Sequence, residues 1–234
     1  MSEWWTYRPS DFLMFSPRIY WRLFQSLNAA WWPAQPLILA TAMCWLAWVG
    51  LPWQLGQRTT GAACRAAAAF LAACWALVAW AFLLQRFAPI HWVATGFALA
   101  FLVQAVGWLA LAGVGGVHGQ VSDARRRAGQ TLGLWALLGH PLLGFAFGRT
   151  WEQAEVFGLA PDPTAIGSLA FLLLVRADGR PLRWLLRTLW VVPLGWCAIS
   201  AATLATMGSA AQSSVLLAAA ASAVAASSRR FAGP

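Results

Sequence analysis

The sequence predicts an all-α membrane protein: a polytopic transmembrane helix bundle of about seven spans (six to seven), preceded by an interfacial amphipathic helix. Apolar residues make up 60% of the 234 residues and charged residues 10%, whereas soluble domains carry about 25% charged residues. Several nearly uncharged windows reach about 18 residues, enough to cross roughly 30 Å of hydrocarbon. Many of the 17 tryptophans fall at the ends of these windows, as in the aromatic belts of membrane proteins.

Residues 1–32 are expected to form the interfacial segment. Ser16 and Pro17 are typical of a helix start, with the serine as N-cap and the proline at the first helical position. From there the helical period places apolar side chains on one face and polar side chains on the other. The apolar face comprises Ile19, Tyr20, Leu23, Phe24 and Leu27, and the polar face Arg18, Arg22, Gln25 and Ser26. Two arginines on one stripe favour a helix that lies in the interface over one that spans the membrane.

Residues 33–228 are expected to form one transmembrane helical domain, followed by a short C-terminal tail at 229–234. The candidate spans cover approximately residues 34–51, 63–84, 90–114, 129–147, 164–175, 184–207 and 213–226. The fifth is short. The seventh is rich in alanine and is either a span packed through small residues or a short re-entrant piece. Gly129 and Gly133 permit the fourth span to approach a neighbouring helix closely.

The 16 basic residues are all arginines, and they give a net charge of +9. They are scattered between apolar segments instead of gathered on one soluble face, so a nucleic-acid partner is not expected. Under seven spans, five of the 16 arginines share the side of the N-terminus and the other 11 lie opposite. The positive-inside rule then places the N-terminus outside and the C-terminus in the cytoplasm. If the last segment does not span, the bias shrinks.

Polar groups inside the bilayer are the usual pointers to function, because burying them is costly. All seven Asp and Glu residues map to loops or to span ends, which argues against a proton or sodium relay built on carboxylates. The deepest polar residues are Gln104 and His140, which form the candidate intramembrane site. The alternative interpretation is that both only make hydrogen bonds between helices.

No metal site and no cofactor are predicted. His91 and His118 lie at opposite ends of the third span, roughly 40 Å apart at the helical rise. His140 differs from His91 in expected depth by about 9 Å, whereas a bis-histidine haem needs matched depths. The four cysteines show no C-x-x-C spacing. The deeper tryptophans could line a site for a flat apolar ligand such as a quinone or pigment, although packing and lipid contact explain them equally well.

The segment Pro161-Asp162-Pro163-Thr164 is the second candidate site. Two prolines flank an aspartate just before the short fifth span, and Asp162 and Thr164 are candidates to cap its helix. Short, proline-interrupted membrane segments are how transporters build broken-helix binding sites. The alternative interpretation is an ordinary outer loop that leads into a helix start.

Three stretches carry a resemblance to a known family. They are residues 4–18 (WWTYRPSDFLMFSPR), residues 157–166 (FG-x-x-P-x-P-T-x-I) and residues 192–196 (VPL-x-W). They resemble a DUF6064-like family of bacterial polytopic membrane proteins of unknown function. The family pattern has a cysteine between the two prolines, where this chain has Asp162. The resemblance implies a bacterial inner membrane and six or seven spans, and it brings no activity, substrate or catalytic residue.

Two classes of function remain open. The first is a small permease or carrier for a small molecule or ion, with its site near Gln104, His140 and the Pro161–Thr164 break. The second is a non-catalytic subunit of a larger membrane complex, which includes a quinone- or haem-associated subunit. No catalytic motif is present, so an enzyme is not favoured. The expected partners are the lipid bilayer and either other membrane subunits or further copies of this chain.

Overall fold

The computed structural model describes residues 15–50 and 56–228, which are 80% helical overall. The helices are α1 (Pro17–Trp31), α2 (Ala34–Gly50), α3 (Gly56–Leu77), η3 (Val78–Phe87), α4 (Ala94–Gly113), α5 (Asp123–Leu134), η4 (Trp135–Gly139), α6 (His140–Ala146), η5 (Trp151–Gln153), α7 (Pro161–Leu174), α8 (Arg180–Thr188), α9 (Val191–Thr206) and α10 (Ala210–Ser228). Two-residue strands, β1 (Val117–His118) and β2 (Arg176–Ala177), form an antiparallel pair that the all-α prediction did not include. The predicted tail at 229–234 and residues 1–14 of the predicted interfacial segment lie outside the described residues.

Four helices in the described part of the chain are long and apolar enough to cross a membrane. They cover Gly61–Phe87, Ala94–Gly113, Arg180–Thr206 and Ala210–Ser228. A fifth span is counted if α1 and α2, which meet at 90°, form one broken span. The sequence therefore predicted the membrane-type helices, but seven spans are not confirmed. The 14 residues of α7 extend about 21 Å, too short for the hydrocarbon core.

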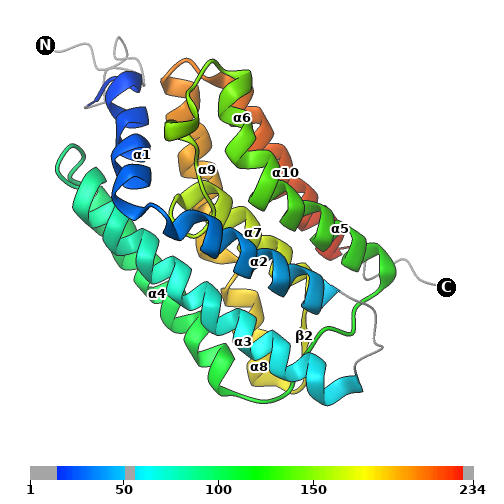
Figure 1. Ribbon diagram of the computed structural model, residues 1–234. Helices are drawn as coiled ribbons and strands as arrows, with labels where there is room; N and C mark the ends of the chain where they lie inside the picture. The colour runs from blue at the N-terminus through cyan, green and yellow to red at the C-terminus, as the bar shows by residue number, and fades with distance from the viewer. Residues whose placement is uncertain (1–14, 51–55, 229–234) are drawn as a thin grey trace, which may run out of the picture.

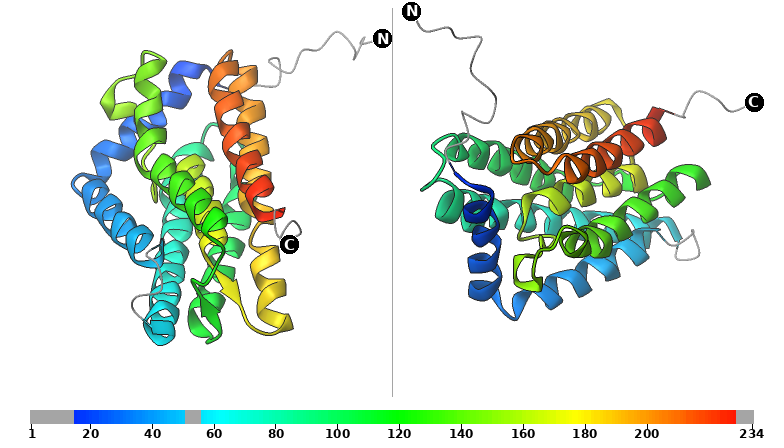
Figure 2. Two further views of the ribbon diagram at one scale, coloured as in Figure 1. Left: turned by 90° about the vertical axis from the view of Figure 1, so that its right-hand side faces the viewer. Right: turned by 90° about the horizontal axis from the view of Figure 1, so that it is seen from above.

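The short helix α7 lies in the middle of the bundle. It packs against α5 on one side and against α9 and α10 on another, and it also touches α2 and α3 (Figures 1 and 2). All of its residues except Gly167 are buried. The longer helices run beside it along a common axis (Figure 1). The segment predicted as a fifth span is therefore the core of the fold, because every face of it is covered by other helices.

The approach of α5 to α7 depends on Gly129, as the sequence predicted for the fourth span. A Cβ atom built on Gly129 would lie 2.8 Å from the Leu174 side chain and 3.0 Å from the carbonyl oxygen of Ala170. Gly133 is equally close to a different helix, since its Cβ would lie 2.6 Å from the Leu46 side chain on α2. Small residues at helix contacts are how membrane bundles bring backbones together.

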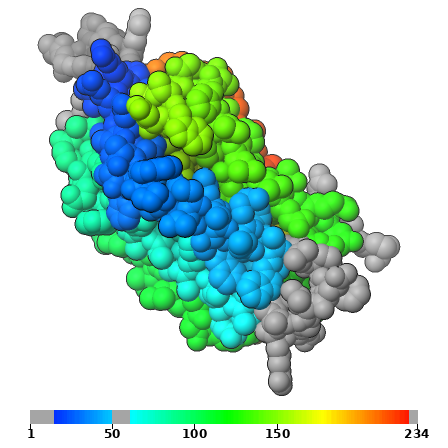
Figure 3. Space-filling view, in the orientation of Figure 1, coloured from blue at the N-terminus to red at the C-terminus, as the bar shows by residue number. Residues whose placement is uncertain are grey.

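Helix α1 packs across one end of the bundle, beside the segment that contains η5 (Figure 3). Ser16 caps it, because the serine side chain accepts a hydrogen bond from the backbone N–H of Ile19. Tyr20, Phe24 and Leu27 are buried, and Phe24 stacks on Phe82 of η3 with ring centroids 4.8 Å apart. The predicted apolar face is thus confirmed for these three residues. Ile19 is 44% exposed, because the contact stripe is narrower than predicted.

Candidate functional site

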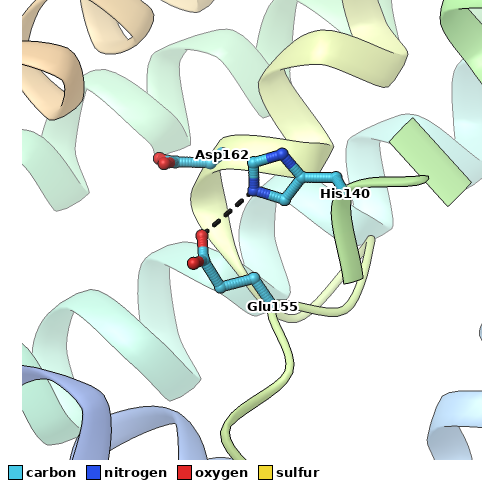
Figure 4. Close-up of side chains that lie close together, drawn as sticks. All are labelled: His140, Glu155 and Asp162. Carbon is cyan, nitrogen blue, oxygen red and sulfur yellow. Dashed lines mark hydrogen bonds and ion pairs between the residues drawn. The ribbon is translucent and has the colours of Figure 1, made fainter. Parts of the chain in front are cut away.

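Three ionisable side chains meet inside the bundle and form what we call the polar cluster: His140, Glu155 and Asp162 (Figure 4). Each residue is only 2% exposed. One nitrogen or oxygen atom from each lies within 4.8 Å of the corresponding atoms of the other two. His140 begins α6, Glu155 lies in the irregular segment after η5, and Asp162 stands in the first turn of α7. Three separate parts of the chain therefore converge on one point.

A buried turn places Glu155 and Asp162 beside each other. The backbone N–H groups of Leu159 and Ala160 donate to the Val156 carbonyl, which folds the chain back toward α7. Gly158 has a φ of +81°, and a Cβ there would lie 2.7 Å from the Ile38 side chain. Residues that carry a side chain rarely adopt a positive φ, and a Cβ atom here would clash with Ile38. Glycine is therefore required at position 158 for both reasons.

Thr164 closes this turn. Its hydroxyl oxygen accepts from the backbone N–H of Gly158 at 2.8 Å and donates to the carbonyl of Ala160 at 2.6 Å. The prediction that Asp162 and Thr164 cap α7 is wrong, because the N-cap residue is Ala160 and neither side chain makes a capping bond. Pro161 occupies the first helical position, as expected of proline at a helix start.

Glu155 accepts hydrogen bonds from three residues. Its Oε2 atom lies 3.1 Å from Nε2 of His140. Its Oε1 atom accepts from Nη1 of Arg149 at 2.7 Å and from Nε2 of Gln212 at 3.1 Å. The Arg149 guanidinium also lies over the ring of Trp21, 3.9 Å from the centroid. The negative charge of Glu155 is therefore offset by a buried positive charge.

Asp162 has neutral partners instead. Its two carboxylate oxygens accept from Nε1 of Trp196 and from Oγ of Ser200, each at 2.7 Å, and both donors lie on α9. Within residues 15–50 and 56–228, no arginine forms an ion pair with it. The cluster thus brings two carboxyl groups together, and of the two only Glu155 has an arginine partner in the described part of the chain.

The two carboxyl groups are shifted in opposite directions, and both lie outside the spanning helices. Burial raises the pKa of Asp162, and the nearby charge of Glu155 raises it further. Burial also acts to raise the pKa of Glu155, but its hydrogen bond and charge interaction with His140, together with the Arg149 guanidinium, outweigh burial and lower that pKa. Opposed shifts in adjacent groups are common at functional sites.

Three buried polar atoms of this network have no hydrogen-bond partner among the described residues: Nδ1 of His140, Nε of Arg149 and Oε1 of Gln212. Buried polar groups in folded proteins are almost always bonded, and an exception points to a site where water or an ion belongs. The network around Glu155 holds three such atoms together, whereas Gln35, His91 and Trp108 hold one each. The arrangement therefore fits a binding site better than a closed structural network.

The structure separates the two residues of the predicted intramembrane site. Nε2 of Gln104 donates to the Leu189 carbonyl at 2.9 Å, where α8 meets α9. No hydrogen bond in the described part of the chain joins Gln104 to His140. Gln104 therefore makes a contact between helices, which was the alternative interpretation, while His140 belongs to the polar cluster. The four residues Pro161–Thr164 are all buried, so the interpretation as an ordinary outer loop does not hold.

Sequence reasoning missed Glu155, Arg149 and Gln212. Glu155 lies in a loop and Asp162 at a helix start, as expected of all seven carboxylates, but both are buried inside the bundle. One signal for Glu155 was present in the sequence. Residues 154–160 read A-E-V-F-G-L-A, a stretch that is apolar apart from the glutamate, whereas solvated loops are rich in Ser, Asn, Asp, Gly and Pro.

The fold and the polar cluster define a helical protein with helices that could cross a membrane and with a buried ionisable site at the start of a short central helix. Residues 17–232 match the sequence model of a family of unknown function, DUF6064. The chain therefore belongs to this family, as its three sequence stretches suggested. No curated protein and no solved structure matches the chain.

Proposed function

We propose that this protein is a small permease or carrier of the bacterial inner membrane and that it binds a small cation at the polar cluster. The single observation that carries the proposal is the burial of two carboxylates and an imidazole at one point of a bundle with membrane-type helices. Ionisable groups at such positions are costly and in membrane proteins mark ion or substrate pathways. The two carboxyl groups among its three members favour a cation over an anion.

The local backbone also supports a carrier. Irregular backbone inside a membrane protein is tolerated where other helices bury it or where it lines a cavity. The buried turn at Val156–Ala160 and the short helix α7 have this character. In transporters, binding sites form at such interruptions because carbonyl and side-chain groups become available there. The candidate segment Pro161–Thr164 and His140 thus contribute to the same site in this proposal, whereas Gln104 contributes to helix packing.

The orientation of the chain is part of the proposal. An odd number of spans places the two termini on opposite sides of the membrane, and the arginine bias counted for seven spans makes the C-terminal side the cytoplasmic one. Five spans, with α1 and α2 counted as one broken span, place each terminus on the same side as seven spans do. A reporter fused to each terminus and active on only one side of the membrane tests this orientation. Activity of both reporters on the same side would contradict it.

Reconstitution into vesicles tests the carrier. The purified protein is placed in liposomes that contain a dye for H⁺, Na⁺ or Zn²⁺, and a membrane potential negative inside is imposed. We expect at least one cation to enter faster than in empty vesicles and the entry to be lost in Asp162→Asn. The matched control is Asp178→Asn, which changes an exposed aspartate that pairs with His118 at 3.3 Å.

Absence of any protein-dependent cation entry, or entry that Asp162→Asn leaves unchanged, would refute the carrier. The other class, a non-catalytic subunit of a larger complex, predicts a different result. The chain extracted from its own membrane in mild detergent would then migrate with other proteins at fixed stoichiometry. A carrier is expected to migrate alone or as a homo-oligomer.

A further inference from the structure

We propose that the polar cluster is a binding site for a divalent transition-metal cation of the Zn²⁺ type. This inference rests on the proposed function, since it names the class of cation that the carrier would bind. The cluster offers one imidazole nitrogen and two carboxylates, from His140, Glu155 and Asp162. Mixed nitrogen and oxygen donors suit Zn²⁺ and its first-row neighbours, whereas Mg²⁺ and Ca²⁺ prefer oxygen alone.

The geometry is close to that of a bound ion. Ligands of a tetrahedral Zn²⁺ at about 2.1 Å lie about 3.4 Å from one another. Nε2 of His140 and Oε2 of Glu155 are already 3.1 Å apart, and the longest separation in the cluster is at most 4.8 Å. A shift of Asp162 by roughly 1 Å toward the other two would complete three ligands. Side-chain rotation can supply this shift without moving a helix.

Neighbouring donors would hold these ligands in place. Trp196 and Ser200 each bond one oxygen of Asp162, while Arg149 bonds Glu155 through the oxygen that faces away from His140. Oε2 of Glu155 and both oxygens of Asp162 accept one bond each and keep a lone pair for an ion, because an oxygen accepts up to two bonds. Oε1 of Glu155 already accepts two bonds. Hydrogen bonds of this kind orient metal ligands in known metal sites.

A fourth donor is available from an independent observation. Oε1 of Gln212 is buried without a partner, although Nε2 of the same side chain donates to Oε1 of Glu155. Gln212 itself is 1% exposed. The buried, unpartnered amide oxygen therefore lies beside the cluster and can coordinate the ion directly or through a water. Three protein ligands with an open fourth position are typical of zinc sites that exchange a ligand.

The charges favour a site that releases its ion. The Arg149 guanidinium donates to Glu155 beside the site, so it partly opposes the attraction between the two carboxyl groups and a divalent cation. Structural zinc sites, in contrast, hold their ion through thiolates and bind it very tightly. A moderate affinity is what a carrier needs, because a carrier must bind its ion on one side and release it on the other.

Metal binding to the full-length protein tests the inference. The chain is purified in detergent on an affinity tag without histidine, stripped with a chelator and titrated with ZnCl₂ by calorimetry. We expect one Zn²⁺ per chain, and binding at least tenfold weaker in His140→Gln and in Asp162→Asn. His118→Gln is the matched control, because His118 pairs with the exposed carboxylate of Asp178, away from the cluster. The Zn²⁺ affinity of this variant should equal that of the wild type.

A second measurement guards against misfolded variants. Size-exclusion chromatography and tryptophan fluorescence select the variants that remain folded, and X-ray absorption of the wild-type complex reports the donor atoms directly. A coordination shell of nitrogen and oxygen atoms around the bound Zn²⁺ supports the proposed site. A shell that contains sulfur, or no stoichiometric binding below 1 mM Zn²⁺ in folded wild-type protein, overturns it.

The two proposals fail in different ways. If Zn²⁺ does not bind but Asp162→Asn abolishes entry of another cation into vesicles, the metal site is wrong and the carrier stands. If Zn²⁺ binds at the cluster but no cation crosses the membrane, the carrier is wrong. The site is then a metal centre of a protein that does not transport.

Discussion

Replacing Arg149 by methionine should destabilise the protein strongly. Arg149 is the one arginine of the described residues that pairs with Glu155, which is 2% exposed. Methionine keeps most of the apolar contact of the arginine with Trp21 but leaves the carboxylate without its positive partner. Removing one partner of a buried ion pair costs about 3–5 kcal/mol, because the other charge stays buried. The cation–π contact with Trp21 adds about 0.5–1 kcal/mol.

Thermal unfolding in detergent measures this loss. For a chain of this size, 1 kcal/mol corresponds to about 2–4 °C in Tm, so the combined loss of about 3.5–6 kcal/mol in Arg149→Met should lower the Tm by about 7–24 °C. The control is Arg126→Met, which breaks the ion pair with the 68% exposed Asp123 side chain. Exposed pairs contribute about 0–1 kcal/mol, and the control should change the Tm by less than 4 °C.

The double variant Arg149→Met/Glu155→Met distinguishes an unpaired charge from lost packing. If the cost arises from the unpaired carboxylate, removing both charges should recover most of the stability. The reasoning is refuted if Arg149→Met costs no more than Arg126→Met. It is also refuted if the double variant is as unstable as the sum of the two single variants.

Three further variants test the packing. Gly129→Ala should lower the free energy of unfolding by about 1–3 kcal/mol through overpacking, because the added Cβ would meet Leu174 and the Ala170 carbonyl. Its control is Gly96→Ala, which has open space around it and should be neutral or stabilising by up to about 1 kcal/mol. Trp75→Phe should lower the free energy of unfolding by about 1–2 kcal/mol, because it removes the 2.7 Å hydrogen bond from Nε1 to Ser168. An unchanged free energy of unfolding in chemical denaturation would show that this bond does not stabilise the fold. Gln104→Leu should cost about 1 kcal/mol through loss of its bond to Leu189 yet leave Zn²⁺ affinity unchanged; a tenfold loss of affinity would place Gln104 in the site after all.

Local sequence patterns predicted the helices well, because helix formation and apolar length depend on neighbouring residues. The buried stripe Tyr20, Phe24 and Leu27 follows from the helical period alone. The number of spans could not be predicted from these patterns, because a window of apolar residues does not distinguish a helix in lipid from a helix enclosed by protein. Helix α7 is apolar and buried on all sides by its neighbours, and sequence composition describes both situations equally.

The site was predicted only in part. His140 and Asp162 were both singled out, but as members of different sites, and His140 was joined with Gln104. His140 in fact contacts Glu155, which lies 15 residues further along the chain, beyond α6 and η5. The geometry of this contact depends on the turn at Gly158 and on α10, which supplies Gln212. Such contacts between distant segments are set by tertiary packing, for which a single sequence carries no periodic signal.

The chain order of the cluster has a consequence for synthesis. Asp162 is made 34 residues before Trp196 and 38 before Ser200, and Glu155 is made 57 residues before Gln212. Both carboxylates therefore leave the ribosome well before their partners on α9 and α10. The carboxyl group of Asp162 stays without these two donors until α9 has been made. A chain truncated before α9 would carry all three residues of the polar cluster and still lack the donors that hold Asp162 in place.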